Sequence, residues 1–247
     1  MTAPVFLVDV LQGVQPGAEV LLDGSEGRHA VSVRRLQSGE EIVLTDGRGR
    51  GAAGTVTRTE GKDRLFVTVA DALTEEEPSP RITVVQALPK GDRGELAVET
   101  MTETGVDAVV PWSAARCITQ WRGERGAKSL AKWRATAREA GKQSRRLRFP
   151  EVAEAATTRQ VAELLAGADF AAVLHEVGDR PLATAELPAE GSIVLVVGPE
   201  GGVSPEELAA FEAAGALPYR LGHTVLRTST AGTAGAALLL GRTGRWS

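Results

Sequence analysis

The sequence predicts an α/β protein of two domains, a small β-barrel followed by a larger domain built on a parallel sheet. The chain has 247 residues, 43% of them apolar, which is long for one ordinary domain and enough for two buried cores. Its first part consists of short apolar runs separated by turns, whereas the second part alternates strand and helix patterns. Between them, residues 73–80 are acidic and contain prolines, as expected of a linker. We therefore expect domains at residues 1–72 and 81–247.

Five short apolar runs in the first domain predict the strands of a small barrel. Turn residues separate these runs, among them Asp46-Gly47 and Glu60-Gly61. A short helix is expected at Gly27–Leu36, where the strand pattern is interrupted. The expected strands are Val5–Val8, Ala18–Leu22, Glu41–Thr45, Ala52–Arg58 and Leu65–Val69.

The second domain begins with a strand, a helix and a further strand. The first strand is expected at Ile82–Leu88, and the helix is expected to start at the cap residue Asp92 and to end at Gly105. The next strand, from Val106, is expected to stop at Pro111. Because the later strands are continuous apolar runs, we expect a parallel sheet buried on both faces. The later elements are helices at Ala127–Gln143, Gln160–Leu165, Pro205–Ala214 and Thr230–Leu240, and strands at Phe170–His175, Ile193–Val197 and Pro218–Leu221.

Two glycine-marked turns follow predicted strands and form the expected ligand site. The first is Val197-Gly198-Pro199-Glu200-Gly201-Gly202, and the second is Leu221-Gly222, which leads into the hydroxyl-bearing residues Thr228, Ser229 and Thr230. Glycines let backbone amides approach a ligand closely, and two strand ends opening into irregular backbone make a crevice. The alternative is a tight turn without a ligand. The small residues after Thr230 predict close helix packing, either within the chain or across a dimer.

The residues after the first turn indicate which ligand the crevice takes. Ser204-Pro205-Glu206-Glu207 is a capping box with proline at the first helical position, so the helix amides are satisfied and carboxylates lie at its entrance. With Glu200, these carboxylates are expected to repel a phosphate. A ligand that is uncharged at its base and ribose, or cationic, fits better, and S-adenosylmethionine has both properties.

A compact basic segment lies between Arg116 and Arg148. It contains eleven Lys or Arg residues and two acidic ones, although the whole chain carries a net charge of −4. Arg134, Arg138 and Arg145 are spaced to form a row along one face of the predicted helix. Such a separation of charge is typical of a surface that binds nucleic-acid phosphates. The alternative is an ordinary solvated helix.

Several features bear on compartment and on metal binding. Cys117 is the single cysteine, which excludes an intramolecular disulfide and a cysteine-rich metal site and favours a reducing compartment. No apolar run is long enough to span a membrane, and the N-terminus has no signal-peptide pattern. We expect a soluble cytoplasmic protein with neither a membrane segment nor a metal.

The two turns and the positions around them resemble a known family. Gly198 to Gly202, Leu221-Gly222 and Leu226-Arg227-Thr228-x-Thr230-Ala231 are similar to motifs of the trefoil-knot (SPOUT) methyltransferases, specifically the bacterial 16S ribosomal RNA uridine-N3 methyltransferases. The resemblance covers essentially the whole chain. Departures are Ser229, where many relatives have glutamate, Glu99, where lysine is common, and Arg34, where leucine is usual. Further matching positions are His29, Val33, Arg35, Leu36, Gly39, Lys90-Gly91, Glu103-x-Gly105-Val106, Pro111, Arg116, Trp133, Ala140, Gln143-Ser144 and Arg146 to Pro150.

The resemblance implies both the architecture and the reaction. It implies a PUA-like barrel, a methyltransferase domain knotted at about residues 193–240, and a homodimer. It further implies transfer of the methyl group of S-adenosylmethionine to N3 of a uridine in 16S ribosomal RNA within the small subunit, leaving S-adenosylhomocysteine. Two alternatives stay open: a related knotted enzyme that modifies another position of RNA, or a noncatalytic RNA-binding or ribosome-assembly protein on this fold.

The resemblance also assigns roles to residues. Arg146 is the candidate catalytic residue, which orients the substrate or stabilises charge on it, and no general base is assigned because Ser229 replaces the glutamate. The expected cofactor-binding residues are Val197, Gly198, Pro199, Glu200, Gly201, Gly202, Leu221, Gly222, Leu226, Arg227, Thr228, Thr230 and Ala231. The expected RNA-binding residues are Arg28, His29, Arg35, Lys90, Arg116, Arg134, Arg138, Arg145 and Arg148.

Overall fold

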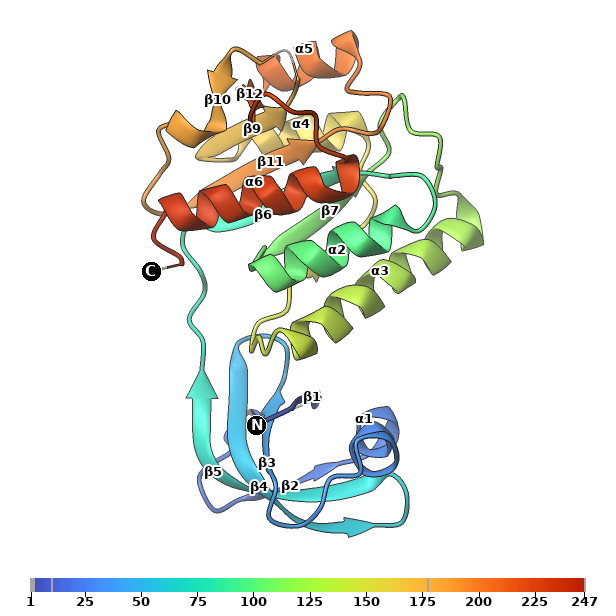
Figure 1. The fold of residues 1–247 in the computed structure, drawn as a ribbon, viewed down its shortest axis with the longest axis vertical. Coiled ribbons are helices and arrows are strands. Elements are labelled where there is room, and N and C mark those ends of the chain that lie inside the picture. Colours follow the sequence, from blue (N-terminus) through green and yellow to red (C-terminus); the bar gives the residue numbers. More distant parts are fainter. Residues whose placement is uncertain (1–2, 10, 177, 247) are drawn as a thin grey trace. The chain divides into compact units, whose positions relative to one another are not determined.

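The chain forms two compact units in the computed structural model, which describes residues 3–9, 11–176 and 178–246 (Figure 1). The first unit comprises Met1–Glu77 together with Gly141–Phe149, and the second comprises Pro78–Ala140 together with Pro150–Ser247. We expected residues 81–247 to form one continuous domain, and the structure corrects this at residues 141–149. Both expected domains also contain residues outside the described part of the chain, namely 1, 2, 10, 177 and 247.

Hydrogen bonds explain why the segment 141–149 belongs to the first unit. Gly49 N donates to Leu147 O (3.0 Å), and Phe149 N donates to Gly47 O (2.9 Å). The buried Lys142 ammonium pairs with Glu26 Oε1 at 2.7 Å. These partners are distant in sequence, and no local pattern in a basic segment indicates them.

The first unit contains a five-stranded sheet in the order β1-β3-β4-β5-β2. Strands β1 and β3 pair in parallel, and the other pairs are antiparallel. β4 and β5 are eleven residues each, longer than expected, because their polar, exposed ends continue the hairpin ladder. In place of the helix expected at 27–36, the short helix α1 (Gly24–Arg28) runs into a π-helical turn, η1 (His29–Val33). The strands are β1 Val5–Leu7, β2 Glu19–Leu22, β3 Glu41–Thr45, β4 Arg50–Glu60 and β5 Arg64–Thr74.

The second unit is built on a seven-stranded sheet in which all pairs are parallel, as expected. Its order is β10-β12-β9-β11-β6-β7-β8. β8 and β10 have two residues each, too short to leave a pattern in the sequence. The strands are β6 Arg81–Ala87, β7 Ala108–Trp112, β8 Glu151–Val152, β9 Phe170–Leu174, β10 Arg180–Pro181, β11 Ser192–Val197 and β12 Leu217–Arg220.

Pro111 lies inside β7 and does not end it, contrary to expectation. The Pro111 carbonyl accepts from Ala156 N (2.7 Å), so the proline nitrogen faces the same side of the strand, away from β6. On that side β8 has already ended at Val152. The missing N–H therefore removes no bond between strands.

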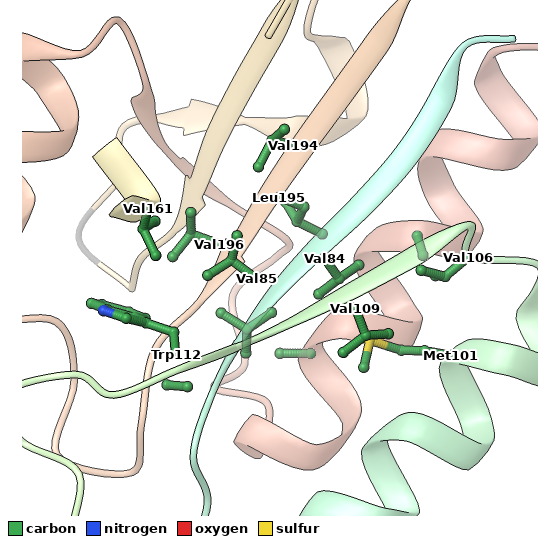
Figure 2. Packing of buried hydrophobic residues seen from close by; sticks show 14 of the residues in the cluster. Val84, Val85, Met101, Val106, Val109, Trp112, Val161, Val194, Leu195 and Val196 are labelled. Carbon is green, nitrogen blue, oxygen red and sulfur yellow. The ribbon is translucent and has the colours of Figure 1, made fainter. Parts of the chain in front are cut away.

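Helices cover the sheet of the second unit. Adjacent core residues point to opposite faces of the strands, so Val84 and Leu195 share one face while Val85 and Val196 share the other (Figure 2). The α2 cap position is held by Asp92, whose side chain makes no capping hydrogen bond, and Gly105 ends α2 with φ 110°. The helices are α2 Arg93–Thr104, α3 Gly123–Gln143, α4 Thr158–Ala166, α5 Pro205–Ala213 and α6 Thr228–Arg242, with a 3₁₀ turn, η2, at Leu182–Thr184.

The small residues of α6 serve packing within the chain. A Cβ at Gly235 would lie 2.6 Å from Leu195 Cδ2, and one at Gly232 would lie 2.8 Å from Met101 Sδ. The two glycines therefore let α6 lie directly on the sheet and on α2. Among the described helices, none is long and apolar enough to cross a membrane.

Candidate active site

A cavity of about 750 Å³ lies at the carboxyl ends of β9, β11 and β12 in the second unit. Loops after these three strands form its wall, as is usual where parallel strands end. Of the thirteen residues expected to bind a cofactor, twelve line this cavity. The exception is Thr230, whose side chain is exposed and donates to Arg227 O (3.1 Å).

The first glycine loop, residues 198–202, has no room for larger side chains. A Cβ at Gly198 would lie 2.9 Å from Val203 Cγ2, and one at Gly201 would lie 3.2 Å from Arg116 Cβ. Gly202 has φ 73°, a conformation that favours glycine, and its N–H donates to Pro199 O (2.9 Å). The glycines thus set the path of the loop and leave backbone facing the cavity.

Thr228 ties the glycine loop to the rest of the unit. Its Oγ1 donates to Gly198 O (2.8 Å) and accepts from Gln86 Nε2 (3.0 Å). Thr228 is the first residue of α6, so this one hydroxyl connects α6, β6 and the loop after β11. The threonine is buried; its bond to Gln86 is buried and its bond to Gly198 is partly buried.

Lys90 and Arg116, which we assigned to RNA, contact the same loop. The Lys90 backbone N–H donates to Glu200 Oε1 (3.1 Å), and Arg116 NH1 donates to Gly201 O (3.1 Å). Arg116 also lines the cavity. Arg116 therefore lies at the cavity that is expected to bind the cofactor.

The capping box is present as expected, but the electrostatic argument drawn from it is wrong. Ser204 and Glu207 make both reciprocal bonds, and Glu207 is buried and also accepts from Ala115 N (2.7 Å). Hydrogen bonds from its own backbone amide and from Ser204 lower the pKa of Glu206. Neither Glu206 nor Glu207 lines the cavity. The charged residues that do line it are Glu176, Glu200, Arg93, Arg116, Arg220 and Arg227, so the cavity charge does not exclude a phosphate.

The remaining basic residues divide between the two units. Lys90, Arg134 and Arg138 belong to the second unit, whereas Arg28, His29, Arg35, Arg145, Arg146 and Arg148 belong to the first. The row expected along the helix is broken, because α3 ends at Gln143 and Arg145 follows with φ 60°.

Arg134 and Arg148, which were expected to bind RNA, are held by partners distant in sequence. Arg134 Nε donates to Val152 O (3.0 Å), and its NH2 donates to Glu154 Oε1 (2.9 Å). Arg148 NH2 donates to Glu75 O (3.2 Å). These bonds give Arg134 and Arg148 structural roles that the sequence did not show.

Most of the other members of the set are exposed, as Arg134 also is. Arg28, Arg35, Arg138 and Arg145 are exposed. His29 is half-buried and meets the Phe6 ring edge to face, with ring centroids 5.8 Å apart.

Comparisons with known proteins agree along nearly the whole chain. Residues 75–240 match the RNA methyltransferase domain family, and residues 22–70 match the RNA methyltransferase PUA domain family. The ribosomal RNA small subunit methyltransferase E of Mycobacterium tuberculosis is 45% identical, and the alignment covers 100% of this chain and 94% of that protein. The chain belongs to the ribosomal RNA small subunit methyltransferase E family.

Solved structures share the fold of this chain. The Neisseria gonorrhoeae enzyme, crystallised with bound S-adenosylmethionine, superimposes with a TM-score of 0.87 at 29% identity, covering 98% of both chains. A Legionella pneumophila protein in complex with the same cofactor gives a TM-score of 0.84 at 28% identity and equal coverage. The expected fold class, a PUA-like domain followed by a parallel-sheet methyltransferase domain, is confirmed.

In this member of the methyltransferase E family, some residues of the cavity wall were not predicted from the sequence. Arg93, Glu176, Tyr219 and Arg220 line the cavity but were not expected there. A signal for two of them existed, because Glu176 and Arg220 lie at the ends of predicted strands whose carboxyl ends meet at one sheet edge. Arg93 begins α2, beyond the loop that follows the predicted strand Ile82–Leu88, so the position of that strand's end did not indicate it.

Proposed function

We propose that this chain transfers the methyl group of S-adenosylmethionine to N3 of a uridine in the 16S ribosomal RNA of the small subunit. Membership of its family shows that the chain is an S-adenosylmethionine-dependent ribosomal RNA methyltransferase. What we propose in addition is the position on the RNA that receives the methyl group. The observation that carries the proposal is the glycine-lined cavity at the ends of β9, β11 and β12. The knot at about residues 193–240, the homodimer and the assembled small subunit as substrate belong to the same proposal.

The residues around the cavity fit the cofactor. Backbone at Gly198 and Gly201 offers hydrogen-bonding groups without side chains in the way. The carboxylates of Glu176 and Glu200 line the cavity and can lie beside a cationic sulfonium, although four arginines line the same cavity. When bound, the cofactor supplies a methyl group on a positively charged sulfur. The hydroxyl of Thr228 keeps the binding loop in place.

The reaction requires the uridine N3 proton to leave and negative charge on the uracil ring to be stabilised. We assign Arg146 to this role or to holding the extruded base, with Arg116 and Lys90 as the next candidates. Arg146 lies in the segment 141–149 of the first unit, which supports contact with RNA through that segment. Ser229 is buried within α6 and has no carboxylate, so it is not assigned as the base.

Replacing Arg146 separates substrate chemistry from cofactor binding. Arg146→Ala should lower the methylation rate by about 100-fold or more, as expected when a group that stabilises developing charge is lost. Its affinity for S-adenosylhomocysteine, measured by calorimetry, should stay within about twofold of the wild type. Arg159→Ala is the control, because Arg159 is an exposed cation that is not among the residues expected to bind RNA. Equal losses of rate and cofactor affinity in Arg146→Ala contradict the assignment.

Two measurements test the function itself. Calorimetry of the wild type with S-adenosylhomocysteine should show binding. The absence of heat in a folded sample would contradict the proposed function and support the alternative, a noncatalytic RNA-binding protein. Mapping modified nucleotides in small-subunit ribosomal RNA from cells that lack this protein should show the loss of one N3-methyluridine. Loss of a ribose or guanine methyl group instead would reassign the reaction.

A further inference from the structure

A second cavity, of about 460 Å³, lies in the second unit. It is enclosed by the end of β6, the start of α2, residues 118–121 before α3, and the first turns of α3. None of its lining residues is shared with the cofactor cavity. The two are nevertheless neighbours along the chain, since Arg93 lines the first while Gly91 and Gly94 line the second.

The aromatic wall of this cavity is held in place by close packing. Trp121 is partly exposed and meets the buried Trp133 edge to face, with ring centroids 4.9 Å apart and an interplanar angle of 79°. A Cβ at Gly94 would lie 2.6 Å from Trp133 Cζ2, so glycine is required for this packing. Thr119 Oγ1 donates to Pro89 O (2.8 Å) and ties the loop that carries Trp121 to the end of β6. The wall is therefore preformed.

The cavity also contains a carboxylate with one oxygen unpaired. Glu95 Oε1 pairs with Lys132 Nζ at 2.9 Å, whereas Glu95 Oε2 is shielded from solvent and has no hydrogen-bond partner in the described part of the chain. A shielded polar atom without a partner is costly, and a donor that reaches it gains correspondingly. The ligand that fits therefore carries an N–H group.

The charges around the second cavity further restrict which kinds of ligand it can bind. A carboxylate in the wall disfavours a phosphate beside Glu95. The cations Arg125 and Lys132 disfavour a positively charged ligand, and Arg125 also lines the cavity and is exposed. A flat, neutral group with N–H donors on its edge and a phosphate outside it meets all of these conditions, and an unpaired nucleotide has that chemistry.

We propose that this second cavity binds an unpaired nucleobase of the RNA substrate. The base stacks on Trp121, and the Glu95 side chain, which is 22% exposed, turns so that its Oε2 accepts an N–H from the base. Arg125 binds the adjoining phosphate. This base is not the methylated one, because the reacting nitrogen must meet the cofactor in the first cavity. The inference rests on the proposed function in taking RNA as the substrate, and it adds a site that anchors a neighbouring nucleotide.

The test measures equilibrium binding of small-subunit ribosomal RNA by filter retention, without cofactor. Trp121→Ala should weaken RNA binding by about 5- to 150-fold, the range for loss of one base–aromatic stack. Trp246→Ala is the matched control, because Trp246 is an exposed tryptophan of the same unit that lines neither cavity. Affinity for S-adenosylhomocysteine should be unchanged in both variants, which also shows that they are folded.

A second variant tests the contact with Glu95, and a modified RNA identifies the base that binds in the cavity. In Glu95→Gln, Lys132 holds the amide oxygen, so the amide NH₂ faces the base N–H and RNA binding should fall about tenfold or more. Removing single bases from the RNA should reveal one unpaired position whose loss weakens binding by the wild type but not by Trp121→Ala.

The results distinguish this site from the proposed function. If the wild type binds RNA and both Trp121→Ala and Glu95→Gln bind it as tightly as Trp246→Ala, the second cavity is not a base site. The second cavity is also not a base site if every base removal weakens RNA binding by the same factor in the wild type and in Trp121→Ala. A wild type that binds RNA but transfers no methyl group contradicts the proposed function and leaves the base site standing.

Discussion

The hydroxyl of Thr228 should control both the stability of the second unit and its affinity for the cofactor. Thr228→Val keeps the shape of the side chain but removes the bonds to Gly198 O (2.8 Å) and Gln86 Nε2 (3.0 Å). At about 1 kcal/mol for each net hydrogen bond, the free energy of unfolding should fall by about 2 kcal/mol. For a protein of this size that lowers Tm by about 4–8 °C.

The same substitution releases the glycine loop that lines the cofactor cavity. Loss of the bond that holds Gly198, about 1 kcal/mol, predicts about fivefold weaker binding of S-adenosylhomocysteine. Thermal denaturation and calorimetry measure the two effects on one sample. Thr228→Ser restores the hydroxyl and should recover most of both.

Thr230→Val is the matched control for Thr228→Val. Thr230 lies two residues further along α6, is exposed, and bonds Arg227 O instead of the loop. It should change Tm and cofactor affinity little. If Thr228→Val leaves both quantities at the wild-type value, or if Thr230→Val changes them equally, the hydroxyl does not position the loop.

Two further predictions concern Gly201 and Cys117. Gly201→Val should abolish binding of S-adenosylhomocysteine in calorimetry while RNA binding persists, because even a Cβ there would lie 3.2 Å from Arg116 Cβ; retained cofactor binding contradicts the role of the loop. Burial raises the pKa of the Cys117 thiol, so at pH 8 the folded protein should react slowly with a disulfide reagent and the urea-unfolded protein quickly. Equal rates in the two states contradict that burial.

The glycine turns could be recognised from the sequence because their requirement is local. Gly198 directly follows a buried strand, and Gly202 lies in the same loop. A side chain at Gly198 would crowd Val203, and Gly202 has a positive φ that favours glycine. The capping box at Ser204 and Glu207 is similarly contained within four residues. Strands and helices with regular apolar periodicity were found for the same reason, although their ends moved by a few residues.

The roles of the basic residues could not be predicted in this way, because a charge pattern does not reveal its partners. Arg134 and Arg148 belong to a basic segment but are held by Val152, Glu154 and Glu75. Arg145 was expected on a helix face and lies beyond the helix end.

By itself, the sequence determined the succession of the longer strands and helices, the two glycine loops and the charge of each segment, since these depend on neighbours within one or two turns. The tertiary structure decided which segments meet. It placed residues 141–149 with the first unit, allowed Pro111 inside a strand, and brought Glu95 and Trp121 to one cavity. Such contacts depend on chain closure over long separations, and local residue patterns do not encode them.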